Sequence, residues 1–256
     1  GIFATPILVS TMKRLIFVIC FLCTLLSSSL SAEVPRLFVG LGVGIPFFFR
    51  DFHDSQRGFY FQEEFTRLSD YNIRGGIQEG ALLGFYFLPN SGVLFLWSRS
   101  NADMDLFMES TYPHPYYVHT LRPLSLTRND LSYRVNQWDF NYIYRFYRSQ
   151  GLALSLFVGY TLLSVKPEIL QEVSVSEVSP YTVPVLKEVV LNEERVNTSG
   201  INFGVLLQKS LFKRAGGALF IQYTDGEAEM KRVGKEALKL PLNNLKLTAY
   251  LTFRIL

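Results

Sequence analysis

Strict alternation of apolar with small or polar residues is the feature that most restricts how this chain can fold. Between residues 152 and 162, six alternate positions carry Leu, Val or Tyr, and the positions between them include Ala, Ser, Gly and Thr. Successive side chains of a β-strand point to opposite faces, so this period of two predicts a strand with one apolar face. Eight segments show the pattern, at about 36–48, 74–88, 92–106, 130–147, 151–166, 196–212, 217–230 and 241–256.

The connections between these segments alternate in length. Those at 89–92, 148–151 and 213–216 are short and contain glycine, as tight hairpins require. Those at about 49–73, 107–129, 167–195 and 231–240 are long, and we expect loops there, with 167–195 continuing as a strand hairpin. The strict alternation predicts an all-β, antiparallel, up-and-down β-barrel of eight strands, with short turns at one rim and long connections at the other.

The distribution of residues over the two faces distinguishes a soluble barrel from a membrane barrel. One face of the segments is apolar and aromatic along its length. The other face carries residues such as Gly40, Gly42, Asn141 and Asn202, which would not build the core of a soluble protein. Of the 256 residues, 48% are hydrophobic and only 18% are charged, yet no run approaches the roughly 20 apolar residues of a membrane helix except one near the N-terminus. The interpretation is a transmembrane barrel with an apolar outer band and a polar interior.

The N-terminal segment has the layout of a secretory signal peptide. Lys13 and Arg14 precede the apolar run 15–26, and the small residues of 27–32 follow, so we assign 12–32 to a signal peptide. Residues 1–11 are interpreted as an upstream extension or a fragment edge, and 33–256 as the barrel domain. Cys20 and Cys23 both lie in the signal, so the mature chain is expected to have no disulfide framework.

On this architecture the chain resembles the small eight-stranded outer-membrane β-barrels typified by the OmpA membrane domain and OmpX. Members of such families usually end in an aromatic residue that the assembly machinery reads, whereas Leu256 is last here, after Phe253 in an outward position. The resemblance implies localisation in the outer membrane of a diderm bacterium and contact with outer-membrane lipid and lipopolysaccharide. It also implies insertion by the barrel-assembly machinery.

An eight-stranded barrel is only wide enough to be filled by side chains. The polar interior is predicted to include Arg99, Asp103, Asp105, Asp139, Asn141, Arg145, Lys246 and Arg254, together with Asn101, Gln137, Asn202, Gln208 and Gln222. Because buried charges need partners, we expect Arg99 to contact Asp139 inside the barrel. The network is interpreted as a plug, and a gated pore or proton path is the functional alternative.

No arrangement of residues points to catalysis, a cofactor or a metal ion. His53, His114 and His119 all fall in predicted loops, and prolines on both sides of His114 exclude a single helical face. No histidine lies beside a serine at alternating spacing in a predicted strand, so we expect no enzymatic activity. The net charge of +3, from 25 basic and 22 acidic residues without a basic cluster, argues against nucleic-acid binding.

The long connections are the remaining candidates, because rigid scaffolds commonly carry function on their loops. Aromatic residues there could contact an extracellular ligand, namely Phe59, Tyr60, Phe61, Tyr116 and Tyr117. We expect a monomeric outer-membrane barrel with a filled interior and a structural or interaction role. The alternatives are a porin-like channel for small solutes and a lipid-modifying outer-membrane enzyme.

Overall fold

The structure is a computed structural model, and it describes residues 36–49, 51–117, 119–149, 151–230 and 237–255. The predicted signal peptide and residues 1–11 lie outside the described residues. The described residues form eleven strands: β1 (Leu37–Phe48), β2 (Phe52–Tyr60), β3 (Glu63–Tyr86), β4 (Ser91–Pro113), β5 (Leu121–Ser149), β6 (Leu152–Ser176), β7 (Val185–Glu193), β8 (Val196–Ser210), β9 (Ala215–Met230), β10 (Leu238–Pro241) and β11 (Asn244–Arg254). Among these residues, no helix is long and apolar enough to cross a membrane.

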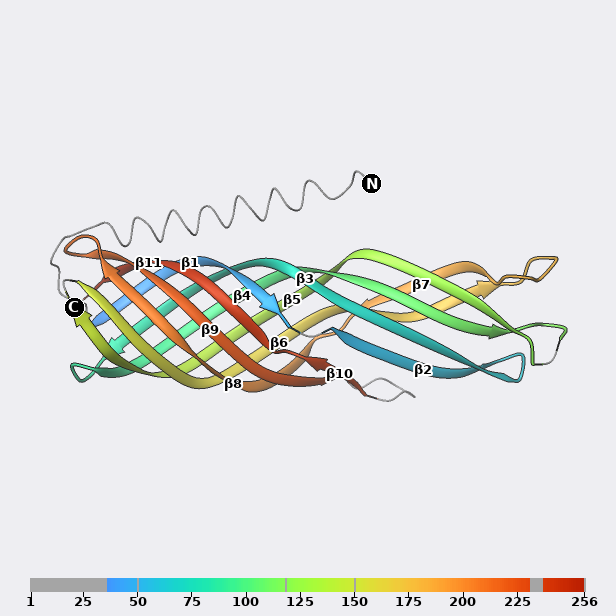
Figure 1. Cartoon of the computed structure of the whole chain (residues 1–256), viewed down its shortest axis with the longest axis horizontal. Coiled ribbons are helices and arrows are strands. Elements are labelled where there is room, and N and C mark those ends of the chain that lie inside the picture. The colour runs from blue at the N-terminus through green and yellow to red at the C-terminus, as the bar shows by residue number, and fades with distance from the viewer. Residues whose placement is uncertain (1–35, 50, 118, 150, 231–236, 256) are drawn as a thin grey trace.

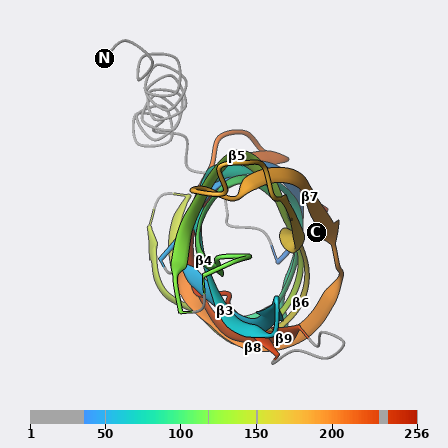
Figure 2. The same cartoon turned by 90° about the vertical axis from the view of Figure 1, so that its right-hand side faces the viewer.

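Eight of the strands close into a ring, which Figure 2 shows end-on. The ring order is β1, β3, β4, β5, β6, β8, β9 and β11, and every neighbouring pair is antiparallel. β1 closes the ring because its two edges are both paired: Val39 lies opposite Leu83 of β3 and opposite Phe253 of β11. Each predicted segment overlaps one ring strand, so the eight-stranded up-and-down barrel is confirmed.

The long connections are largely strands, which corrects the prediction of loops at 49–73 and 107–129. The β2–β3 ladder runs from Phe52 opposite Tyr71 to Tyr60 opposite Glu63, and the β4–β5 ladder continues to Pro113 opposite Leu121. The β6–β7 hairpin confirms the prediction for the third connection, and β10 pairs with β9 in the fourth. All these extensions project from one end of the barrel (Figure 1). Apolar and polar residues are mixed on both faces of these hairpins, which weakens the period of two there.

The outer surface of the ring changes from apolar to polar partway along the strands. On β4 the outward residues are Phe95 and Trp97, and Arg99 follows; on β5 Trp138 is outward and Asn136 lies beyond it. Trp97 and Trp138 are opposite each other in register, with ring centroids 6.3 Å apart. An exposed apolar band bordered by aromatic residues is typical of a transmembrane barrel. This tryptophan pair therefore marks the outer edge of the hydrocarbon core of the membrane, and the hairpins extend beyond it.

Three layers of side chains fill the interior. Near the short turns lies an apolar cluster: Phe38, Leu82, Tyr86, Leu94, Leu96, Ile143, Phe157, Leu206, Ala218, Phe220 and Tyr250. A polar layer around Asp139 and Lys246 follows, and beyond the membrane a larger apolar cluster includes Tyr71, Met104, Leu106, Tyr133, Val165 and Leu240. The prediction of a generally polar interior is therefore wrong at both ends. The hairpins leave the membrane, so their inner faces bury apolar side chains away from water as a soluble protein does.

The glycines of β1 are explained by this packing. A Cβ on Gly42 would lie 2.5 Å from the Tyr250 ring and 2.4 Å from the carbonyl oxygen of Ala249. Glycine at this inward position therefore gives the Tyr250 side chain room to fill the barrel.

Candidate functional site

The predicted contact between Arg99 and Asp139 is wrong, because the two side chains lie on opposite sides of the barrel wall. Arg99 faces outward and is exposed, opposite Asn136, whereas Asp139 is only 1% exposed and lies opposite Leu96. Asp103 and Asp105 share the outward face with Arg99, as does Asn101, and Asp105 pairs with Arg74. Above the membrane belt the outer face is wet, so a polar residue there no longer indicates the interior.

Asp139 is the centre of the polar layer. Its carboxylate accepts hydrogen bonds from Gln137 Nε2 at 2.7 Å, Thr161 Oγ1 at 2.6 Å, Gln222 Nε2 at 2.9 Å and Asn202 Nδ2 at 3.3 Å. These donors come from β5, β6, β9 and β8, so one carboxylate connects four ring strands.

Lys246 is the cation of the same layer. Its ammonium donates to Ser98 Oγ at 3.1 Å and to Gln137 Oε1, so Gln137 bridges Lys246 and Asp139. Both charged side chains are buried and hydrogen-bonded, which fits the interpretation of the network as a plug.

The other predicted interior residues lie closer to the short turns. Arg145 is buried, with its guanidinium 3.7 Å from the centre of the Tyr86 ring and Nη1 donating to the Pro89 carbonyl at 3.2 Å. Asn141 is buried on the same face of β5, four residues further from the short turn, and Arg254 is half-buried at the rim. These residues complete the packed interior at the end of the short turns.

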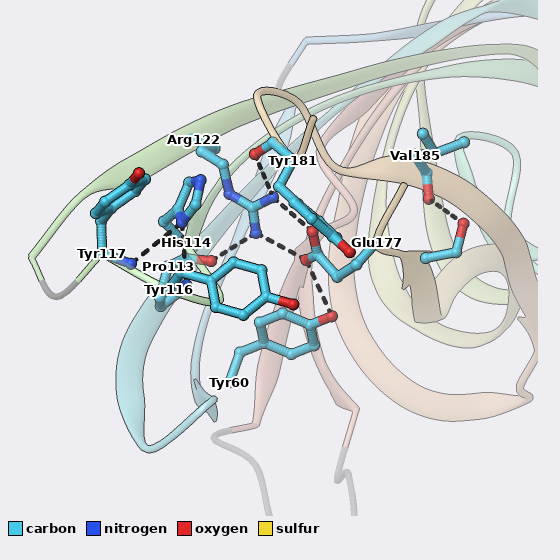
Figure 3. Close-up of polar contacts among 10 residues, drawn as sticks. Tyr60, Pro113, His114, Tyr116, Tyr117, Arg122, Glu177, Tyr181 and Val185 are labelled. Atoms are coloured by element: carbon cyan, nitrogen blue, oxygen red, sulfur yellow. Dashed lines mark hydrogen bonds and ion pairs between the residues drawn. The ribbon is translucent and has the colours of Figure 1, made fainter. Parts of the chain in front are cut away.

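At the opposite end, a buried ion pair joins the tips of the long hairpins (Figure 3). The guanidinium of Arg122 on β5 donates to both carboxylate oxygens of Glu177, which follows β6, at 2.6 and 2.7 Å. It also donates to the carbonyls of Pro113 at 2.6 Å and Tyr181 at 3.1 Å. Arg122 is 3% exposed. The pair therefore clamps the β4–β5 hairpin to the β6–β7 hairpin.

The β2–β3 hairpin joins the same tip. Tyr60 donates its hydroxyl to Glu177 at 3.3 Å, and the carboxylate of Glu63 accepts from the backbone N–H of His119 at 3.3 Å. The three hairpins thus meet at one end of the molecule, which we call the tip.

Aromatic side chains are exposed around this clamp. Phe59 is 79% exposed, Phe61 53%, Tyr116 68% and Tyr117 67%, whereas Tyr60 is half-buried. The conformation of the β4–β5 turn is held by His114, whose Nδ1 accepts the backbone N–H groups of Tyr116 and Tyr117 at 3.1 and 3.2 Å. The predicted surface aromatics are therefore gathered at one end of the molecule.

A cleft of about 680 Å³ adjoins the tip. Phe65 and Tyr112 are stacked on one of its walls, with ring centroids 5.1 Å apart, and Tyr60 lies edge-on to Tyr112 at 5.5 Å. Buried Gln56 and Arg67, which are hydrogen-bonded to each other, supply polar groups. The volume falls in the range of small-ligand pockets. Elsewhere in the described part of the chain, no three His, Cys, Asp or Glu side chains gather as a metal site.

Comparison with known proteins supports the architecture. No protein-family model matches the sequence, and no curated protein matches it either. Among solved structures, the outer membrane protein OprG from Pseudomonas aeruginosa aligns with a TM-score of 0.51 at 9% identity, covering 88% of this chain and 98% of that one. By architecture, the chain is a small eight-stranded outer-membrane β-barrel.

Two further solved structures also align with this outer-membrane barrel. Neisserial surface protein A aligns with a TM-score of 0.44 at 9% identity, covering 86% of the barrel's chain and 97% of its own. Ail, the attachment invasion locus protein of Yersinia pestis, aligns at 0.35 and 10% identity, covering 84% and 98%.

The electrostatics of the tip stabilise its ion pair. Hydrogen bonds from Arg122 lower the pKa of the Glu177 carboxyl, and burial together with Glu177 raises the pKa of the Tyr60 phenol. Glu177 is therefore ionised and Tyr60 protonated at neutral pH. A carboxyl whose pKa is lowered by folding stabilises the fold above the ordinary carboxyl range and loses that contribution as the pH falls through its folded value.

We expect acid to loosen the tip of the barrel. Below about pH 4, the ordinary carboxyl range, Glu177 begins to take up a proton and the clamp weakens progressively. Spin labels on cysteines replacing Thr120 and Val183 would measure the distance between the two hairpins, which should broaden between pH 7 and pH 3. Glu177→Gln is the control and should show no such change. An unaltered distance distribution in the parent protein would refute the role of the ion pair.

Sequence reasoning located the aromatics of the tip but not the clamp. Arg122 lies in a region interpreted as a loop, and Glu177 is one of six acidic residues in the third connection. Their contact joins positions 55 residues apart, and no local pattern indicates it.

Proposed function

We propose that this outer-membrane barrel is a surface interaction protein that binds an extracellular partner with its aromatic tip. The observation that carries the proposal is the set of exposed aromatic side chains on the β2–β3 and β4–β5 hairpins. The Arg122–Glu177 ion pair and the Tyr60–Glu177 hydrogen bond tie both of these hairpins to the β6–β7 hairpin. Large aromatic side chains provide much of the binding energy in protein interfaces. A tip that is already ordered loses less conformational entropy on binding.

The packed interior supports this role over transport. Apolar clusters lie above and below the Asp139 layer. The carboxylate and the ammonium of that layer are hydrogen-bonded to neighbouring side chains. A channel needs a continuous water path, and packed apolar clusters interrupt such a path. We therefore place the function on the extracellular hairpins.

Photo-crosslinking at the tip tests this proposal. A photoreactive phenylalanine analogue would replace Phe59 or Tyr116 in cells that display the barrel. Phe212, which is exposed at a short turn at the other end, is the matched control. The proposal predicts the same discrete adduct from both tip positions and none from Phe212. It also predicts that Arg122→Ala removes most of the adduct. Equal labelling at all three positions, or none at the tip, would contradict an interaction role.

A further inference from the structure

A compact group of cations lies on the outer wall of the barrel, well below the tip. Arg134 of β5 is opposite Lys166 of β6 in the ladder, and both side chains are about 40% exposed. Arg195 immediately precedes β8, whose first residue Val196 pairs with Val165, so Arg195 lies beside Lys166. Three adjacent strand positions thus place three cations in one row, which we call the cation row.

Local contacts draw the three cationic groups together. Glu193 forms ion pairs with Arg134 Nη2 and Lys166 Nζ, both at 3.6 Å, and Arg195 Nε donates a hydrogen bond to Ser164 Oγ at 2.7 Å. Ser164 lies two residues nearer to the membrane belt than Lys166, so the guanidinium of Arg195 is directed toward the membrane. Glu168 lies opposite Glu193 in the ladder and shares the outward face with Lys166, so three cations lie against two carboxylates and leave an excess of one positive charge.

The cation row stands at the level of the lipid headgroups. Arg134 is four residues beyond Trp138, about 13 Å along a strand that rises ~3.3 Å per residue. Strand tilt of ~40° reduces this to about 10 Å above the aromatic belt. Long Arg and Lys side chains reach several ångströms further, toward the interface. Lipid headgroups are therefore the molecules that this outward-facing row meets.

We propose that Arg134, Lys166 and Arg195 bind a phosphate group on the headgroup of an outer-leaflet glycolipid. A phosphomonoester carries about 1.5 to 2 negative charges, so it is attracted by the net positive charge of the row. Guanidinium groups pair well with phosphate oxygens through parallel N–H donors, and lysine adds a point charge. Glu193 holds two of the cations in place without neutralising all three. The site is independent of the partner bound at the tip.

The purified barrel in detergent tests the proposal. Native mass spectrometry would compare binding of diphosphoryl lipid A with binding of the same lipid after enzymatic removal of its phosphates. The triple variant Arg134→Gln/Lys166→Gln/Arg195→Gln removes the row, and Arg57→Gln/Lys187→Gln/Lys239→Gln removes the same charge elsewhere on the extracellular part. We expect the parent protein and the control to prefer the phosphorylated lipid by about tenfold, equivalent to ~1.4 kcal/mol, and the triple variant to prefer it by less than about twofold.

Single substitution of Arg195 provides a second route if the triple variant fails to fold. This residue lies between β7 and β8, outside any ladder, so Arg195→Gln should leave the barrel intact and lower the preference at least about threefold. The proposal is overturned if the parent shows no preference for the phosphorylated lipid, or if the variants retain it. Full competition by millimolar inorganic phosphate would also overturn it, because the site would then be a general anion site.

Discussion

Asp139→Leu is expected to lower the free energy of unfolding of the barrel by about 3–5 kcal/mol, the usual effect of leaving a buried charge uncompensated. The substitution leaves Lys246 buried without a nearby anion. It also removes the acceptor for Gln137, Thr161, Asn202 and Gln222, and buried donors without a partner are unfavourable.

Urea titration of the barrel refolded into lipid vesicles would measure this loss, with the folded fraction followed by its faster mobility in unboiled gels. The double variant Asp139→Leu/Lys246→Met is the matched control, because it removes both charges and replaces them with apolar side chains. It should recover a substantial part of the lost stability, which would reveal a coupling between the two positions. Additive losses, or a single variant as stable as the parent, would show that the polar layer does not hold the strands together.

Arg122→Ala is expected to release the tip while leaving the barrel in the membrane folded. It leaves the Glu177 carboxylate, which is largely buried, without its cation, and it removes donors from the carbonyls of Pro113 and Tyr181. Loss of one partner of a buried pair is worth about 3–5 kcal/mol, which increases local opening of the hairpins at least about a hundredfold.

Hydrogen exchange at neutral pH would report this opening at the ends of the β4–β5 and β6–β7 ladders. Arg57→Ala is the control: Arg57 forms a 4.0 Å pair with Glu64, in which both side chains are more than half exposed, and such pairs contribute little. Exchange should accelerate at the tip in Arg122→Ala only, and strand β11 should keep its protection. Equal exchange in both variants would show that the ion pair does not hold the hairpins together.

The membrane half of the fold could be predicted because the bilayer imposes a simple rule on it. Along β5 and β6 every second residue between the short turn and Trp138 or Leu162 faces lipid, so the period of two is almost uninterrupted. The same rule fails beyond the belt. On β4, Trp97 and Arg99 share one outward face, but hydrocarbon surrounds the first, whereas the second lies beyond it in the polar headgroup region. Within the membrane a polar residue indicates the interior, whereas beyond the hydrocarbon core a polar residue also occurs on the outer face. The membrane rule therefore gave the wrong position for Arg99, Asp103 and Asp105.

The candidate site was only partly predictable for a related reason. Phe59, Phe61, Tyr116 and Tyr117 are conspicuous as aromatics outside the alternating segments. That they meet at one tip depends on the β2–β3 and β4–β5 ladders continuing far beyond the membrane and on the contact between Arg122 and Glu177. Such a contact depends on tertiary geometry and has no signature in either local sequence.

Planar-bilayer recording tests the central claim, a sealed barrel that acts through its tip, most directly. The purified barrel should produce no stepwise currents above the background of detergent alone, because apolar clusters close the interior on both sides of the Asp139 layer. An eight-stranded channel of known conductance should produce steps under the same conditions. Reproducible steps of uniform size from the barrel, lost when it is denatured by boiling before addition, would contradict the account and favour a channel.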